Sequence, residues 1–336
     1  MVSVKDIALA CNVSVATVSK ALNGYSDISE KTRETVRKKA AELGYLPNLA
    51  AVALKTNRTY NIGILFYDDA GTGLTQEFFA KVLQGIKEEA EGKGYSITFI
   101  NNRLGGRKVT YTEHCRHRGY DGVVIACINF SDPDVIELAE SDIPVVTIDH
   151  IYERNSSVSS DNEKGAADLV RFVYDKGHRR IAFIHGSSSA VTDERLKGFK
   201  EECKRLGLDV PEEYFLECSY RDTKKVAECT EKLLKLKNPP TCILFPDDYT
   251  AMGGINVIKG KGLNIPEDIS VVGYDGTGYS RFCDPELATL VQDTDRMGRL
   301  AAGKLIRLIE KPKETEITHE VVEGFISIGK SVKQID

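Results

Sequence analysis

From residue 61 onward, short and largely apolar stretches alternate with segments of helical periodicity. The apolar stretches are four to six residues long, at 62–66, 95–100, 122–126, 144–148, 180–184, 242–245 and 269–273. Amphipathic helices are predicted between strands at 78–92, 166–176 and 194–206. Strands buried on both faces and separated by helices are typical of parallel sheets covered on each side. The alternation therefore predicts an α/β fold.

The predicted strands form two series, and the second series opens with the helix at 166–176. Two series indicate two lobes, each with a doubly wound parallel sheet. Ligands of open α/β sheets bind at the carboxyl ends of the strands, so polar residues just after the strands are candidates for a ligand site.

The first 58 residues instead predict an all-α head of three short helices. Apolar residues at helical spacing mark the first helix near 4–11. Ser14 is a candidate N-cap for a second helix through Leu22, and a third is expected from about 29 to 43, ended by Gly44. Two short helices joined by a tight turn, with a third packed behind them, make a helix-turn-helix unit.

The charge of the chain is unevenly distributed. Residues 1–58 hold nine Lys and Arg against five Asp and Glu, a net charge of +4, whereas the remainder carries −9. A basic head on an acidic body suits a polyanion-binding module joined to a domain with another role, although a solvated basic face would give the same charge.

In a helix-turn-helix unit the second helix lies in the major groove of DNA. Val15 and Ala16 can make only apolar contacts, for example with thymine methyl groups, whereas Lys20 can contact guanine or a phosphate. The hydroxyl side chains can bond phosphates or cap the helix, and Val18 and Leu22 are expected in the core. The expected DNA-binding residues are Ser14, Val15, Ala16, Thr17, Ser19, Lys20 and Asn23.

The runs VKDIALACNVSVATVSKALNG and ISEKTRETVRKKAAELGYLPN resemble the DNA-binding head of the LacI/GalR (lactose-repressor/galactose-repressor) family. GHRRIAFIHG (177–186), ERLKGF (194–199), FPDDYTAMGGI (245–255) and IPEDISVVGYDGTG (265–278) resemble its effector domain, which is similar to a periplasmic sugar-binding protein. The resemblance covers essentially the whole chain. It implies a transcriptional repressor that a small-molecule effector, expected to be a mono- or disaccharide, releases from a palindromic operator. A corepressor-dependent regulator and a sugar-binding protein without DNA function are the alternatives.

The resemblance also implies a domain organisation. Residues 1–58 would form the DNA-binding domain, with a hinge helix at about 48–56 whose Leu54 wedges into the minor groove. Residues 60–336 would bind effector and form a homodimer. Three crossings would divide this body into lobe 1 (about 60–160 plus 290–320) and lobe 2 (about 161–289 plus 321–332). The tail ISIGKSVKQID lacks the leucine heptads of a coiled-coil tetramer.

The resemblance implies that seven residues of this chain bind the effector. Carboxylates and Arg hydrogen-bond sugar hydroxyls, and an aromatic ring packs on the sugar. Asp247 stands where the family usually has Asn, Asp247 and Asp275 could instead cap helices, and Arg195 could instead pair with an acid. An acid-rich site with one Arg favours a neutral polyol over a phosphosugar. The expected effector-binding residues are Gln76, Phe78, Asp149, Arg195, Tyr220, Asp247 and Asp275.

The sequence offers no catalytic constellation and predicts neither a metal site nor a cofactor. His114, Cys115 and His117 form the only His/Cys cluster, and we interpret it as a solvated helix face. No stretch is long and apolar enough to span a membrane, and no secretory pattern opens the chain, so a cytoplasmic location is expected.

Overall fold

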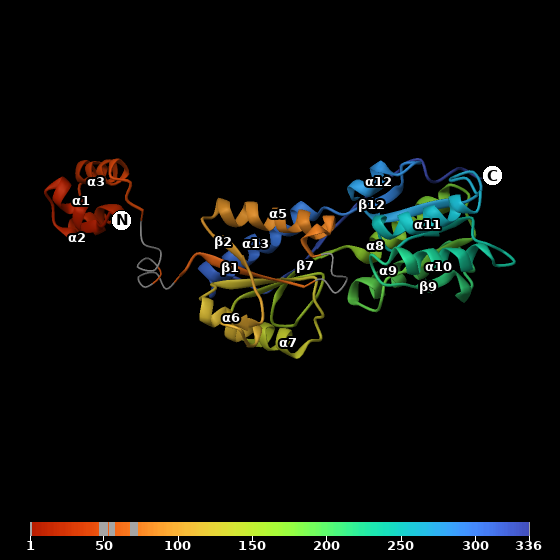
Figure 1. Cartoon of the computed structure of the whole chain (residues 1–336), viewed down its shortest axis with the longest axis horizontal. Helices are drawn as coiled ribbons and strands as arrows, with labels where there is room; N and C mark the ends of the chain where they lie inside the picture. The colour runs from red at the N-terminus through yellow and green to blue at the C-terminus, as the bar shows by residue number, and fades with distance from the viewer. Residues whose placement is uncertain (1, 47–52, 54–57, 68–72, 336) are drawn as a thin grey trace. The chain divides into compact units, whose positions relative to one another are not determined.

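The computed structural model describes residues 2–46, 53, 58–67 and 73–335 (Figure 1). The chain divides into two compact units, Met1–Thr59 and Tyr60–Asp336. Leu54, and the predicted hinge helix apart from residue 53, lie outside the described residues.

The first unit contains the three predicted helices, α1 (Val4–Cys11), α2 (Val15–Leu22) and α3 (Glu30–Glu42). Ser14 and Ser29 cap α2 and α3, because their Oγ atoms accept the Thr17 and Thr32 backbone N–H groups at 3.0 and 3.2 Å. A small core joins the helices and consists of Ile7, Ala8, Val18, Ala21, Val36 and Ala40. The predicted helix-turn-helix fold of the head is confirmed.

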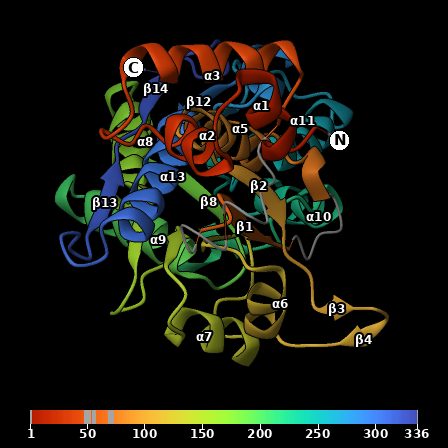
Figure 2. The same ribbon diagram turned by 90° about the vertical axis from the view of Figure 1, so that its left-hand side faces the viewer.

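Lobe 1 of the second unit is built on a six-stranded parallel sheet of order β13-β7-β6-β5-β1-β2. Its strands are β1 (Asn61–Phe66), β2 (Ser96–Phe99), β5 (Gly122–Ala126), β6 (Val145–Ile148), β7 (Ser156–Ser160) and β13 (His319–Val322). A 3-10 turn, η1 (Gly73–Thr75), precedes the first helix, and Figure 2 shows the β3–β4 hairpin (Arg103–Leu104, Arg107–Lys108) at the periphery.

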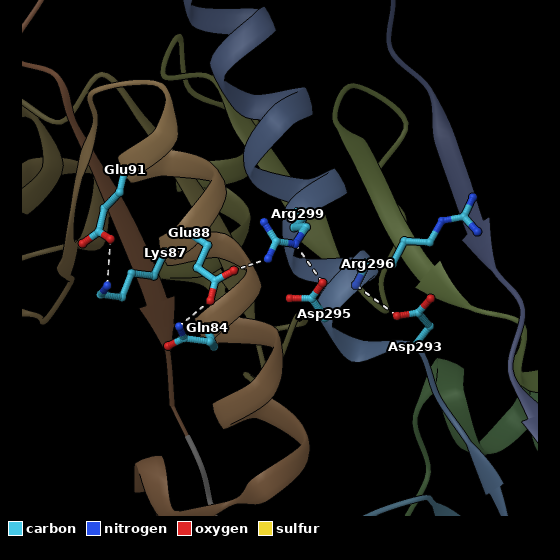
Figure 3. Close-up of polar contacts among 8 residues, drawn as sticks. All are labelled: Gln84, Lys87, Glu88, Glu91, Asp293, Asp295, Arg296 and Arg299. Atoms are coloured by element: carbon cyan, nitrogen blue, oxygen red, sulfur yellow. Dashed lines mark hydrogen bonds and ion pairs between the residues drawn. The ribbon is translucent and has the colours of Figure 1, made fainter. Parts of the chain in front are cut away.

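Helices cover both faces of this sheet. On one face lie α5 (Glu77–Gly92) and α13 (Thr294–Glu310), and on the other α6 (Tyr111–Arg118) and α7 (Pro133–Glu140). Helices α5 and α13 pack closely against each other at Gly298. A Cβ at that position would lie only 2.1 Å from the Val82 carbonyl oxygen. Figure 3 shows Arg299 of α13 bridging to Glu88 of α5 while also pairing with Asp295.

Lobe 2 has the sheet order β14-β12-β11-β10-β8-β9, in which only β14 is antiparallel to its neighbour. One face is covered by α8 and α9 and the other by α10 and α11. The strands are β8 (Ile181–His185), β9 (Phe215–Glu217), β10 (Cys242–Leu244), β11 (Ser270–Asp275), β12 (Ala288–Val291) and β14 (Phe325–Ser327). The helices are α8 (Asn162–Asp175), α9 (Ala190–Arg205), η2 (Glu212–Tyr214), α10 (Thr223–Leu234), α11 (Asp248–Gly260) and α12 (Gly278–Phe282).

These two sheets confirm the predicted α/β class with doubly wound parallel sheets. The chain passes between the lobes after β7, β12 and β13. The last passage follows Val322 rather than residue 320, because β13 pairs with β7 of lobe 1 as far as Val322. Among the described residues, no helix combines the length and apolar character that a membrane crossing requires.

Candidate DNA-binding helix and ligand cavity

The predicted DNA-binding residues occupy α2 and its two caps. Val18 is fully buried, whereas Val15, on the same helix, is 45% exposed. Ala16, Ser19 and Lys20 are exposed as well. The helix therefore presents one face to the small core and the other to solvent, which is the geometry a recognition helix requires.

Several polar side chains of this surface already have partners. Ser14 Oγ caps α2 and lies 2.8 Å from Thr17 Oγ1. Asn23 Nδ2 donates to the Ser19 carbonyl oxygen at 2.6 Å. Lys20 pairs with Asp27, which raises the pKa of Lys20. A DNA contact from Lys20 must therefore replace the Asp27 carboxylate by a base edge or a phosphate.

A cavity of about 840 Å³ lies between the loops that follow strands of both lobes. Lobe 1 contributes residues after β1, β5 and β6. Lobe 2 contributes residues after β8, β9 and β12 and the last residue of β11. This is the edge at which open α/β sheets bind ligands. Six of the seven predicted effector residues line the cavity, namely Gln76, Phe78, Asp149, Arg195, Tyr220 and Asp275.

Arg195 is positioned by α9 and is only 5% exposed. Its Nε donates to Asn162 Oδ1 at 2.9 Å, and its Nη1 donates to the Pro246 carbonyl oxygen at 3.0 Å. The guanidinium carbon lies 3.5 Å from the centre of the Tyr274 ring. These contacts hold the guanidinium without an ion pair, and Nη2 makes no hydrogen bond to any described residue. The alternative of pairing with a neighbouring acid is wrong.

Two half-buried carboxyl groups, one from each lobe, interact with the charge of this arginine. Asp149 Oδ1 accepts the Ser160 backbone N–H at 2.9 Å, and burial raises the pKa of Asp149 to about 6. Asp275 Oδ1 accepts Gln292 Nε2 at 2.7 Å, and burial raises the pKa of Asp275 well above its usual range. Burial thus favours the protonated form of each group, and a protonated carboxyl group donates as well as accepts hydrogen bonds.

Tyr220 forms an aromatic wall of the cavity. Its hydroxyl lies 3.0 Å from Thr192 Oγ1, and a Cβ on Gly186 would lie 2.1 Å from Tyr220 Cε2. Gly186 ends the GHRRIAFIHG run and leaves room for this ring, a role that the sequence analysis did not assign. From lobe 1, Phe78 packs edge-on against Phe79, with ring centroids 4.9 Å apart.

Asp247 does not line the cavity, and its assignment as an effector contact needs correction. It is the N-cap of α11, where Oδ1 accepts the Thr250 backbone N–H at 2.7 Å and Oδ2 accepts the Arg221 backbone N–H at 3.3 Å. Both oxygens are engaged, which agrees with the capping alternative.

Several lining residues were missed by sequence reasoning. Phe130 and His150 stack with ring centroids 4.2 Å apart, and both follow strands of lobe 1. Loops after strands were expected to hold the site, but loop composition alone does not show which side chains point inward. The other missed residues include Tyr67, Phe79, Ser187, Ser188, Ser189, Ser219, Arg221 and Gln292.

Backbone strain concentrates at the cavity. Among the described residues, six non-glycine residues have positive φ, and four of them line the cavity: Cys127, Asp149, Arg221 and Asp275. Such conformations cost about 1–3 kcal/mol each and persist where surrounding contacts enforce them, often at ligand sites.

The described residues hold no group of three or more His, Cys, Asp or Glu placed to bind a metal ion. The solvated-face interpretation of the His/Cys cluster is wrong for His114 and Cys115, which are 1% and 0% exposed in the core of lobe 1. Only His117 of the three is exposed, because α6 turns its other face to the sheet.

Two family models match the chain. Residues 3–48 match the bacterial regulatory proteins of the lacI family, and residues 170–332 match a periplasmic binding protein-like domain. Among solved structures, the lac repressor dimer bound to operator and the anti-inducer ONPF is 26% identical, with a TM-score of 0.79 and 99% coverage of both chains. A complex of the transcriptional regulator CelR with cellobiose is 25% identical, with a TM-score of 0.70 and coverage of 98% and 100%.

Curated relatives agree with these matches. A probable HTH-type transcriptional repressor ExuR of Bacillus subtilis (strain 168) is 31% identical over 320 residues, or 93% of each chain. Catabolite control protein A of Priestia megaterium is 31% identical over 92% of this chain and 93% of its own. An HTH-type transcriptional repressor PurR of Histophilus somni (strain 129Pt) is 30% identical over the full length of both. The chain thus belongs to the LacI family of DNA-binding bacterial transcriptional regulators.

Proposed function

We propose that this protein is a homodimeric repressor that a sugar releases from a pseudo-palindromic operator. Residues 1–58 bind DNA, and residues 60–336 bind the effector and form the dimer. The observation that carries the proposal is the cavity of about 840 Å³, lined from both lobes by Asp149, Arg195, Tyr220 and Asp275. The protein acts in the cytoplasm, where its operator lies.

The DNA-binding role rests on the exposed face of α2. Val15 and Ala16 meet base edges through apolar contacts, and Lys20 contacts guanine or a phosphate after it leaves Asp27. Ser14, Thr17, Ser19 and Asn23 hold the helix ends and approach phosphates. Leu54 enters the minor groove at the centre of the operator, by analogy with the family.

The proposal of a sugar effector is based on the mixture of polar and aromatic side chains in the cavity wall. Carboxyl groups and an arginine fork hydrogen-bond vicinal hydroxyls, while Tyr220 and Phe78 offer ring faces to the apolar side of a sugar. The related CelR structure holds cellobiose, which is consistent with a saccharide in a cavity of this fold.

We infer that contacts between the two lobes couple the ligand cavity to DNA binding. Glu77 of lobe 1 accepts the Gly278 backbone N–H of lobe 2 at 2.8 and 2.9 Å through its two oxygens. Gln76 and Phe78, on either side of Glu77, line the cavity. A ligand that contacts both walls favours one arrangement of the lobes, and a dimer transmits that preference to the heads.

The proposal of a homodimer is based on apolar side chains that are exposed on the surfaces of the two lobes. Phe282 of α12 is 89% exposed, and Phe99 of the edge strand β2 is 42% exposed. A twofold dimer also matches the symmetry of a palindromic operator.

The test is operator selection from random DNA, followed by titration of the selected duplex with and without mono- and disaccharides. Specific binding should exceed binding to random DNA by about 10³-fold or more. One sugar should weaken it in the parent protein, whereas Arg195→Ala should bind operator equally well and ignore the sugar. Tighter binding with ligand would favour the corepressor alternative, and binding of sugar without any operator would favour a sugar-binding protein.

A further inference from the structure

Arg221 is a cavity residue that has no ionic partner in the part of the chain that the structure describes. It follows Tyr220 after β9 and lines the cavity with a φ of 64°. Its guanidinium carbon lies 4.3 Å from the centre of the Tyr249 ring, and its Nε is buried without a hydrogen-bond partner. Among the described residues, its side chain forms neither a hydrogen bond nor an ion pair.

A partly buried guanidinium group without a partner destabilises the folded state, because it loses hydration without gaining an ion pair or hydrogen bonds. Two other arginines of lobe 2, Arg171 and Arg205, both pair with Glu202. Asp247 is the nearby acid, but its carboxylate accepts backbone N–H groups, one of them from Arg221 itself. The fold therefore leaves the charge of Arg221 available to a ligand.

Further hydrogen-bond donors lie on the same wall. Ser187, Ser188, Ser189 and Ser219 all line the cavity. The Ser187 hydroxyl donates to Ser219 Oγ at 3.3 Å, and the Ser189 hydroxyl, the N-cap of α9, donates to Thr192 Oγ1 at 3.1 Å. Among the described residues, the hydroxyls of Ser188 and Ser219 therefore have no acceptor of their own and can donate to a ligand. The serine run leads into the N-terminus of the 16-residue helix α9, whose first backbone N–H groups have no intrahelical acceptors. Arg195, 95% removed from solvent, adds an Nη2 that makes no hydrogen bond to a described residue.

Burial disfavours the charged forms of the two carboxyl groups that share the cavity with the arginines. Burial raises the pKa of Asp275 well above its usual range and that of Asp149 to about 6. His150, on the opposite wall, has a pKa lowered by burial and adds little positive charge.

We propose that Arg221, Ser187, Ser188, Ser189 and Ser219 form a subsite for an anionic group, either carboxylate or phosphate, on a hydroxyl-rich effector. This Arg221 subsite rests on the proposed effector role of the cavity and specifies its ligand class as an acidic sugar. It replaces the neutral polyol expected from a site with only one arginine.

Matched ligands test the subsite in the full-length protein. Melting temperatures are measured with glucose, glucuronate and glucose 6-phosphate, with the corresponding galactose series, and with inorganic phosphate. An acidic member should bind at least about tenfold more tightly than its neutral parent. Arg221→Gln should remove that preference. Glutamine removes the charge and, like arginine, is a non-glycine residue, so the positive φ at this position imposes a similar backbone strain on both. Arg221→Lys should retain part of it, and Arg171→Gln is the control for an equal charge change outside the cavity.

Three results would overturn the subsite. These are equal or tighter binding of the neutral parent, an acid preference that survives Arg221→Gln, and no stabilisation by any anion of the panel, inorganic phosphate included. If Arg221 only stabilises lobe 2 through Tyr249, Arg221→Gln lowers the unliganded melting temperature and leaves the preference intact. Operator binding is assayed separately, so a protein that binds no operator contradicts the proposed function without affecting the ligand comparison.

Discussion

The DNA-binding surface and the ligand cavity are built in opposite ways. The predicted contacts on α2 and its caps come from residues 14–23, ten consecutive positions of one helical unit. The cavity draws on residues from 67 to 292 and on both lobes. Exposed residues of one helix can be substituted without altering the packing of the fold. The shape of a cavity built from distant loops depends on the packing of both lobes.

The strongest test of this contrast uses the same substitution twice on α2. Val18→Asp places a carboxylate in the head core at a residue with 0% exposure, whereas Val15→Asp places it at a residue with 45% exposure. We expect Val18→Asp to unfold the head, because an unpaired buried charge costs several kcal/mol. Operator affinity should fall about 10³-fold or more, to the level of random DNA.

Val15→Asp should keep the head folded and still weaken operator binding, through repulsion from phosphates and loss of apolar contacts. Calorimetry of the full chain resolves the two cases, because only Val18→Asp should remove the head transition. In both variants the transition of the body should be unchanged. A folded head in Val18→Asp would refute the assignment of its core.

The cavity counterpart is Gly186→Ala, where the new Cβ would lie 2.1 Å from the Tyr220 ring. Overpacking of this kind costs about 1–3 kcal/mol, so the body should melt a few degrees lower. The displaced ring should also abolish the ligand-induced rise in melting temperature, while operator binding without ligand persists. Gly92→Ala is the control, since a Cβ there meets nothing within 4 Å. An unchanged ligand response would show that Tyr220 is not part of the site.

The same contrast explains what the sequence could predict. The head could be predicted almost completely, since capping serines and helical spacing act over three or four residues. The strand–helix alternation predicted both lobes, but it missed the strands β7, β9, β12, β13 and β14 of the two main sheets. The SSVSS sequence of β7 has one apolar residue and is buried by its neighbours. Its neighbouring strands pair with it from both sides, and that context is absent from the local pattern.

Sequence reasoning located six cavity residues, and four of them, Gln76, Phe78, Asp149 and Tyr220, lie outside the four quoted motifs of the effector domain. Arg195 and Asp275 lie in such motifs and both line the cavity. Asp247 also lies in a motif, yet its carboxylate turns to the backbone of α11. Arg221 was missed because nothing in its sequence neighbourhood shows that the acids of lobe 2 are already engaged by backbone N–H groups.

A smaller effect concerns buried acids, which the body contains and the described part of the head does not. Asp248 accepts Thr277 and Thr289 hydroxyls at 3.0 and 2.6 Å, and burial raises its pKa to about 7. Because the folded state favours its neutral form, its contribution to stability is complete below about pH 4 and is lost as pH rises through about 7.

The melting temperature of the parent minus that of Asp248→Asn should therefore fall by a few degrees between about pH 5 and pH 8. The difference isolates Asp248 from buried His114 and His178, whose lowered pKa values act in the opposite direction. Exposed Asp209→Asn is the control and should differ from the parent by a constant amount. A difference that rises with pH would contradict the neutral form of Asp248.

The smallest effect is expected at the Lys20–Asp27 pair, which lies on the surface of the head. Asp27→Asn frees the ammonium of Lys20 without removing any buried contact, so the melting temperature should stay within about one degree. Operator affinity should rise about two- to fivefold, because Lys20 no longer has to leave a carboxylate before it contacts DNA.

Lys20→Ala separates the two possible contacts of Lys20, with a phosphate or with guanine. Loss of a phosphate contact weakens all sequences alike and lowers the salt slope by about one, whereas loss of a guanine contact relaxes selection at one base pair. Unchanged affinity in Asp27→Asn together with unchanged affinity in Lys20→Ala would remove Lys20 from the DNA-binding surface and leave recognition to Val15 and Ala16.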